Sequence, residues 1–174
     1  MLHDITITQF TKMLQNLSQC LDKAAAYCSA KKVEPEVLLG TRLAPDQFHL
    51  LRQIQVACDT ARTGVARLTG KEAPALPDND VTLADAKARI EKVIAYLQTF
   101  SANDFAGAAE RHVSQPRWAG KYLTGHEFAV QHMIPNFYFH VTTAYAILRA
   151  NGVDLGKKDY LGAMPFKDPE AAKS

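Results

Sequence analysis

Three polar side chains recur at four-residue spacing inside the longest apolar segment of the chain, residues 124–152. They are His132, Asn136 and His140. Residues four apart lie one above the other on a helix, and two imidazoles at that spacing are able to hold one metal ion. Here an amide, which is a poor ligand for a transition metal, stands between the two imidazoles. The pattern therefore predicts either a divalent-metal site, for zinc, nickel or manganese, or a polar pocket between helices.

The same segment contains a proline that bears on these groups. Pro135 has no amide hydrogen, and its ring crowds the carbonyl of Gln131, so we expect the helix to kink beside the polar residues. Alternatively, Asn136 and His140 only satisfy each other and the kinked backbone. Thr143 adds a hydroxyl one turn later, which either faces the pocket or bonds its own backbone, as threonines in buried helices commonly do.

A second polar group interrupts the apolar stripe of residues 45–69. Gln55 either lines the same pocket or reaches solvent at the edge of the stripe. Asp59 lies further along with Arg52 and Arg62, and these charges either bind an anion or form a solvated face. The helix over residues 45–69 is thus a candidate second wall of the pocket.

Four helical patterns must position these residues. Apolar side chains at intervals of three and four predict helices over residues 5–30, 45–69, 82–101 and 124–150. Pro45 opens the second pattern and Gly70 suits its C-terminal end. Thr82 with Asp85, and Thr124 with Glu127, provide N-terminal capping signals for the last two.

The connections between these helices complete the fold class. Residues 70–81 form a loop with two prolines that reaches about 40 Å, long enough to cross a bundle and let the third helix run parallel to the second. Residues 110–124 predict a small β-hairpin, and the tail from about residue 157 is expected to be extended. The sequence predicts one all-α domain over residues 1–174, a four-helix bundle with a hairpin between its last two long helices.

Composition and charge exclude several classes of function. The 20 Lys and Arg are scattered against 18 Asp and Glu, which argues against nucleic acid as a partner. Cys20, Cys28 and Cys58 show no CxxC pairing and are interpreted as reduced thiols. No signal peptide is recognisable, and polar residues break up residues 128–148, so we expect a cytoplasmic protein that does not enter the membrane.

An aromatic run suggests an oligomer. Phe137, Tyr138 and Phe139 are spread around their helix, so at least one of them faces away from its own bundle. A second subunit is the simplest cover for such a side chain. We therefore expect a homodimer.

Two stretches, RLAPDQFHLLRQIQVACDTA and PNFYFHVTTAYAILRANGV, resemble the DinB/YfiT-like four-helix-bundle superfamily, in particular a bacterial branch of uncharacterised domains of unknown function. The resemblance covers nearly the whole chain. It implies an up-down-down-up bundle that is often dimeric. Many members bind a divalent metal through one His of the second helix and a His-x-x-x-His pair of the fourth, and some are metal-dependent hydrolases or thiol transferases.

Carried over by position, this resemblance implies an altered ligand set. His140 matches the second His of the pair, Asn136 stands at the first, and the place on the second helix falls near Gln53 or Gln55. His132 is able to replace only one missing ligand. We expect a degenerate metal site whose pocket binds a small molecule and is lined by Gln53, Gln55, Asp59, Asn136, His140 and Thr143. The alternatives are a metal-dependent hydrolase or transferase using His140 with His132 or Asn136, and a structural dimer.

Overall fold

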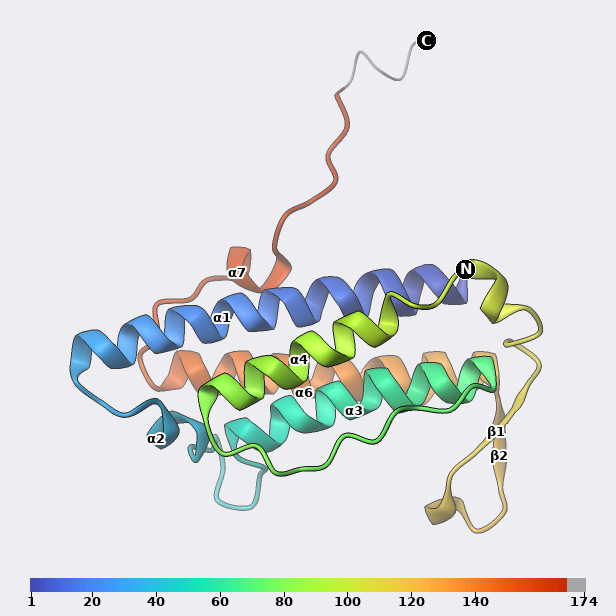
Figure 1. Cartoon of the computed structure of the whole chain (residues 1–174), viewed down its shortest axis with the longest axis horizontal. Helices are drawn as coiled ribbons and strands as arrows, with labels where there is room; N and C mark the ends of the chain where they lie inside the picture. The colour runs from blue at the N-terminus through green and yellow to red at the C-terminus, as the bar shows by residue number, and fades with distance from the viewer. Residues whose placement is uncertain (169–174) are drawn as a thin grey trace.

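Four long helices form the body of the protein: α1 (Gln9–Lys31), α3 (Leu50–Thr69), α4 (Leu83–Leu97) and α6 (Ile134–Ala150) (Figure 1). The computed structural model describes residues 1–168. The shorter elements are π-helical turns at Asp4–Thr8 and Phe128–Met133, 3-10 turns at Ala102–Phe105 and Pro116–Trp118, strands β1 (His112–Ser114) and β2 (Tyr122–Thr124), and helices α2 (Pro35–Leu39), α5 (Gly125–Glu127) and α7 (Lys157–Leu161).

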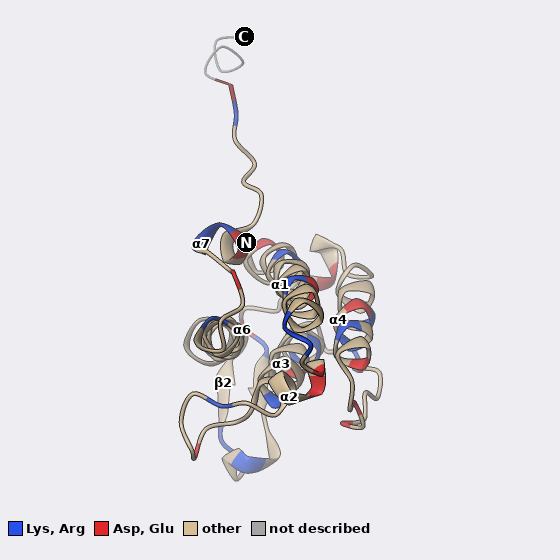
Figure 2. Cartoon of the chain, turned by 90° about the vertical axis from the view of Figure 1, so that its left-hand side faces the viewer, with Lys and Arg blue, Asp and Glu red and all other residues tan. Residues whose placement is uncertain are grey.

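The long helices form a ring in which each packs on two neighbours. Going round the ring, α1 lies beside α4, α4 beside α3, α3 beside α6, and α6 beside α1 (Figure 2). The loop after α3 runs back along the bundle, so that α4 is parallel to α3 while α1 and α6 run the opposite way (Figure 1). The up-down-down-up arrangement and the all-α fold class are therefore confirmed.

The core lies inside this ring and joins all four helices. The rings of Phe10 and Phe137 stack across the α1–α6 contact with centroids 4.1 Å apart. Ile54 and Ile90 bring fully buried side chains from α3 and α4 to the same hydrophobic cluster. Burial of these apolar stripes is the main term that holds the helices together.

The start of α3 differs from the prediction. The helix begins at Leu50 rather than Pro45, because the imidazole of His49 caps it: the Nδ1 atom lies 3.3 Å from the backbone nitrogen of Arg52 and accepts its hydrogen bond. Phe48, which falls within the predicted helix over residues 45–69, is 51% exposed and lies outside the helix. The end is as predicted, with Gly70 at φ +72°.

The last long helix accommodates its proline without breaking. The predicted capping box is present, since Thr124 accepts from the Glu127 nitrogen while the Glu127 carboxylate accepts from the Thr124 nitrogen. The π-helical turn Phe128–Met133 follows, and Pro135 is the second residue of α6. A wider turn just before the proline relieves the clash of its ring with the carbonyl four residues earlier.

The hairpin is confirmed and the tail is partly corrected. Strands β1 and β2 are antiparallel, with Val113 opposite Leu123. The expected extended tail from residue 157 begins instead with α7, because Asp159 accepts from the Gly156 nitrogen at 2.8 Å and pairs with Lys23 at 2.8 Å. Residues 162–168 have no regular structure, and the rest of the predicted tail lies outside the described residues. No helix within residues 1–168 is long and apolar enough to cross a membrane.

Candidate functional site

The contact between α3 and the last long helix carries a row of polar side chains. The two helices run antiparallel (Figure 1), and two pairs of residues bond across the contact. His140 meets Gln53 near one end and Asn136 meets Thr60 in the middle. A polar cavity continues the row toward the β-hairpin. We call this contact the α3–α6 seam.

Near one end of the seam, His140 and Gln53 form a buried pair. His140 Nδ1 lies 2.6 Å from Gln53 Oε1, while Gln53 Nε2 donates to the carbonyl of Phe48 at 2.9 Å. Because the amide nitrogen is used by Phe48, the amide oxygen accepts and His140 carries its proton on Nδ1. Burial, reinforced by the positive charge of Arg52, lowers the pKa of His140 to about 4, so the imidazole is neutral at pH 7.

In the middle of the seam, Asn136 bonds to Thr60. The Nδ2 group donates to Thr60 Oγ1 at 2.8 Å, and that hydroxyl donates onward to the carbonyl of Val56 at 2.7 Å. Since the hydroxyl hydrogen is used, the amide must donate, which fixes its orientation. Within the described part of the chain, nothing bonds to the Asn136 Oδ1 acceptor.

Beside Asn136 lies a cavity of about 180 Å³ between α3, the π-helical turn and the tip of the hairpin. Its apolar lining residues include Val56, Phe128 and Met133. Its walls carry polar side chains, namely Asp59, Thr60, Thr63, Arg67, Gln115, Arg117, His132 and Asn136. We call this space the seam cavity.

His132 belongs to the seam cavity and does not join His140. Its Nε2 atom lies 2.8 Å from Arg117 Nη2, and its ring stacks on Phe128 with centroids 5.5 Å apart. Burial, with the charges of Arg117 and Arg67, lowers the pKa of His132. Eight residues of helix separate His132 from His140, about 12 Å along the axis, and the two rings have different partners.

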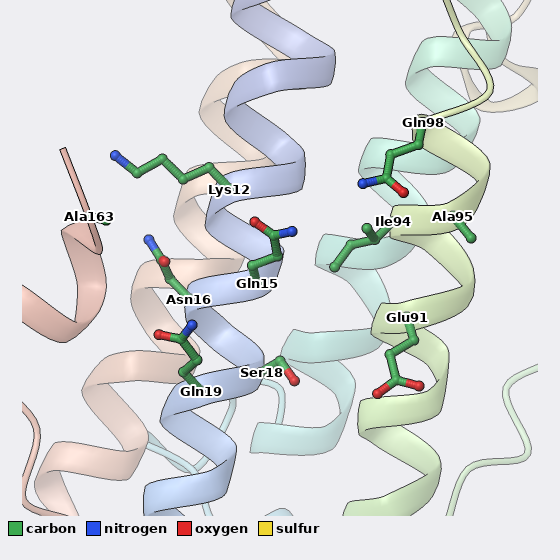
Figure 3. Close-up of a pocket in the computed structure, with 10 residues that line it drawn as sticks. All are labelled: Lys12, Gln15, Asn16, Ser18, Gln19, Glu91, Ile94, Ala95, Gln98 and Ala163. Carbon is green, nitrogen blue, oxygen red and sulfur yellow. The ribbon is translucent and has the colours of Figure 1, made fainter. Parts of the chain in front are cut away.

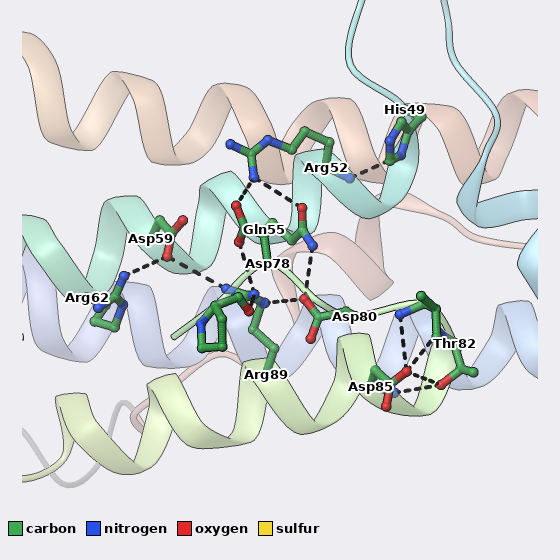
Figure 4. A network of polar contacts seen from close by, with 12 residues as sticks. His49, Arg52, Gln55, Asp59, Arg62, Asp78, Asp80, Thr82, Asp85 and Arg89 are labelled. Atoms are coloured by element: carbon green, nitrogen blue, oxygen red, sulfur yellow. Dashed lines mark hydrogen bonds and ion pairs between the residues drawn. The ribbon is translucent and has the colours of Figure 1, made fainter. Parts of the chain in front are cut away.

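Gln55 turns toward α4, away from His140. Its Nε2 donates to Asp80 at 3.0 Å and its Oε1 accepts from Arg52 at 3.2 Å (Figure 4). Asp59 lines the seam cavity and pairs with Arg62 at 2.9 Å. The predicted pocket residues are therefore divided between two faces of α3.

A buried arginine on α4 holds this second face together, and sequence reasoning missed it. Arg89 is 1% exposed, and its guanidinium meets Asp80 at 2.6 Å, Asp78 at 3.0 Å and the Asp59 carboxylate at 3.7 Å (Figure 4). The network fastens the loop before α4 onto α3 and α4. Two signals pointed to it: an arginine beside Ile90 on the apolar stripe, and the acidic PDND sequence of the loop.

Thr143 is buried but makes no cross-helix bond. Its hydroxyl donates to the carbonyl of Phe139 at 2.7 Å, within its own helix. Of the two alternatives for this residue, the structure has the backbone bond.

The donor set at the implied ligand positions does not fit a divalent metal. Gln53 is the residue that faces His140, so the three positions hold two amides and one imidazole. Both ends of the Gln53 amide are engaged, and the Asn136 nitrogen is bonded to Thr60. Only His140 Nε2 remains as a ligand of the kind that zinc, nickel or manganese sites use. Among residues 1–168, no three His, Cys, Asp or Glu side chains are grouped as a metal site requires.

A larger hollow than the seam cavity lies on another side of the bundle. It is an open groove of about 800 Å³ between α1 and α4, where Gln15 faces Ile94 and Gln98 (Figure 3). Its polar lining is made of four amides (Gln15, Asn16, Gln19 and Gln98) and Ser18, with Lys12 and Glu91 as the charged members. No group of the seam reaches it, so it adds nothing to the chemistry of His140 or His132.

Comparisons with known proteins show the family and the fold of the chain. The family model described as "Domain of unknown function (DUF1993)" matches residues 2–161. A crystal structure of a DinB family member protein from Shewanella denitrificans is 61% identical, with 97% of this chain and 96% of that chain covered and a TM-score of 0.95. Among curated proteins, none matches. The chain therefore belongs to the DUF1993 family of DinB-like four-helix-bundle domains.

Proposed function

We propose that this protein binds a small molecule in the seam cavity, and that it does so without a metal ion. The observation that carries the proposal is a set of cavity-lining polar groups whose hydrogen-bonding capacity is unused within residues 1–168. The buried Nδ1 of His132 has no partner there. Asn136 lines the same cavity, and its one hydrogen bond there is made by Nδ2, which leaves Oδ1 available. Polar groups removed from water need partners, and a bound molecule supplies them.

The size of the cavity supports a compact ligand. Its volume of about 180 Å³ is well above the ~10–15 Å³ that one water requires. It is below the ~300–1,000 Å³ of pockets for drug-sized molecules. A molecule of metabolite size fits these bounds better than a nucleotide cofactor.

Catalysis through the chain's own nucleophiles has little support. All three cysteines are buried. Burial raises the pKa of Cys20 to about 11 and raises the pKa of Cys58 further, so neither is a thiolate at pH 7. With one imidazole and two amides at the implied ligand positions, the hydrolase and transferase alternatives lack a ligand set for a metal-activated water, and neither Cys20 nor Cys58 provides a thiolate. Binding is the better-supported function.

A cavity-filling substitution tests this proposal. Val56→Phe places a larger side chain in the seam cavity, whereas Val37→Phe adds the same atoms on α2, where the side chain is 60% exposed. Each protein is purified without a tag, denatured, and its released small molecules are identified by mass spectrometry. We expect a molecule that accompanies the wild type and Val37→Phe but not Val56→Phe. Equal small-molecule content in all three would overturn the proposal.

We also propose that the protein is a homodimer. Phe139 on α6 is 55% exposed and Val130, in the preceding turn, is 45% exposed. An exposed aromatic side chain on the outer side of a helix, such as Phe139, is typical of an interaction surface. A second copy of the chain, packed against α6 at Phe139, would cover it.

A further inference from the structure

Two arginines face the seam cavity without a carboxylate partner. Arg67 reaches it from α3 and Arg117 from the turn between the strands. Across residues 1–168, neither guanidinium takes part in an ion pair. Asp59, the one acid of the lining, is paired with Arg62. The cavity therefore has two positive charges that the described part of the chain, residues 1–168, leaves without an ion-pair partner.

The positive charge of Arg67 is partly buried and lies near other positive charges. Arg67 is half-buried, and its only side-chain partner in the described chain is the hydroxyl of Thr63 at 2.9 Å. Burial, with the like charges of Arg117 and Arg62, lowers the pKa of Arg67. A bound anion would relieve both the lost hydration and the repulsion between the guanidinium groups.

Arg117 also fixes the protonation of His132. A guanidinium has no acceptor, so the bond of 2.8 Å between them requires His132 Nε2 to accept. The proton of the neutral ring is therefore on Nδ1, a buried donor without a partner in residues 1–168. The cavity lining thus combines the guanidinium groups of Arg67 and Arg117 with the neutral Nδ1–H donor of His132.

The hairpin positions Arg117 at the cavity through Trp118, the next residue in the chain. Trp118 packs edge-on against Phe128, with centroids 6.2 Å apart, and against His132 at 5.5 Å. This contact seats the turn at Pro116–Trp118 on the π-helical segment. The hairpin therefore positions the outer cation of the cavity.

We infer that the ligand of the seam cavity carries a small oxyanion, a carboxylate or a phosphate group, held between Arg67 and Arg117. This inference rests on the proposed function and specifies the chemical class of the ligand. Planar guanidinium groups bind such oxyanions through paired N–H donors. The free Oδ1 of Asn136 lies in the same lining and accepts a hydrogen bond from a hydroxyl or amine elsewhere on the ligand.

The probes are inorganic phosphate and acetate, titrated separately into the full-length protein at constant ionic strength and followed by calorimetry. The variants are Arg67→Gln and Arg117→Gln. Lys121→Gln is the matched control, because it removes the same charge from an exposed residue of the same hairpin. Arg67→Lys keeps the charge without the fork, should Arg67→Gln fail to fold.

We expect saturable binding of one probe, and the probe that binds identifies the group as phosphate or carboxylate. Affinity should fall at least about tenfold in Arg67→Gln, Arg67→Lys and Arg117→Gln, since charge-assisted hydrogen bonds are worth about 1.5–3 kcal/mol. Lys121→Gln should stay within about twofold of the wild type, because its charge is screened by solvent.

Two results would overturn the inference: no saturable binding of either probe, or binding that both arginine substitutions leave unchanged. Its failure is distinguishable from failure of the proposed function. If the molecule released from the wild type is also retained by Arg67→Gln and Arg117→Gln but lost in Val56→Phe, the cavity binds a ligand that is not held as an anion.

Discussion

His140 Nδ1 lies 2.6 Å from Gln53 Oε1, and this bond ties the last long helix to α3 across the seam. It places an amide of α3 opposite the one imidazole that matches a metal ligand of the superfamily. It also fixes that imidazole as a neutral donor through Nδ1. At the His140–Gln53 pair, the α3–α6 seam is therefore a neutral hydrogen-bonded contact.

The pKa of His140 makes stability depend on pH. The folded-state pKa is about 4 against 6.5 for the free side chain, so the unfolded chain binds a proton first as the pH falls. The contribution of His140 to the free energy of unfolding is fully present above pH 6.5. As the pH falls from 6.5 to about 4, the free energy of unfolding decreases by about 3 kcal/mol. Urea unfolding at a series of pH values should show this loss in the wild type and a smaller one in His140→Gln.

The difference between the two proteins isolates His140, because the carboxylates and the other histidines titrate in both. Parallel pH profiles would contradict the buried neutral assignment. A wild type that gains stability relative to His140→Gln as the pH falls would show that the imidazole is charged in the folded state.

Restoring imidazoles at the two amide positions should create a metal site. Gln53→His with Asn136→His gives three histidines where the chain has one, which is a donor set suited to zinc. We expect metal analysis of tag-free protein to find zinc in the double variant and no stoichiometric metal in the wild type. The single variants should bind zinc more weakly than the double variant.

Metal bound to the wild type would contradict this expectation. Stoichiometric metal in the wild type that disappears in His140→Ala would show that the amides suffice as ligands. The assignment of the seam as a contact without metal would then be wrong.

Removing the buried arginine should destabilise the fold severely. Arg89→Met leaves Asp78, Asp80 and Asp59 without their shared cation, and breaking a buried charge network by deleting one partner costs about 3–5 kcal/mol. Lys92→Met, at an exposed position of the same helix, is the control and should cost under about 0.5 kcal/mol. Urea unfolding measures both.

Proteolysis provides a second readout of the same network. The loop before α4 should be cut faster in Arg89→Met than in Lys92→Met at a denaturant concentration where both are folded. Equal cleavage would mean that the network does not hold the loop.

The proposed dimer is tested by charging its exposed aromatic residue. Phe139→Glu places a carboxylate on the outer face of α6 and should convert a dimer to a monomer in sedimentation velocity. Phe166→Glu is the control, because that side chain is 87% exposed in the tail. A wild type that sediments as a monomer at micromolar concentration would remove the proposal.

Local signals in the sequence located the long helices, and the resemblance to the DinB/YfiT-like superfamily implied their up-down-down-up arrangement. The capping boxes at Thr82 and Thr124 and the terminal glycine Gly70 mark helix ends through bonds to residues at most four positions away. The length of the loop before α4 was enough to predict parallel neighbours. The start of α3 was missed because His49 is an uncommon cap.

The site was only partly predictable, because it depends on which helix each face of α3 meets. Gln53 and Gln55 are two positions apart and face different neighbours: Gln53 bonds to His140 of α6, and Gln55 bonds to Asp80 of the loop beside α4. Both faces are buried, so polarity alone does not separate them. Arg117 and His132 meet through the folding of the hairpin, which no local pattern specifies.

Native mass spectrometry of the tag-free wild type tests the central claim most directly, since one spectrum reveals a bound metal or a bound organic molecule. We predict a mass excess corresponding to one small anionic molecule per chain, absent from Val56→Phe and unaffected in His140→Ala. A mass excess equal to a metal ion that His140→Ala removes, with no organic molecule, would contradict it.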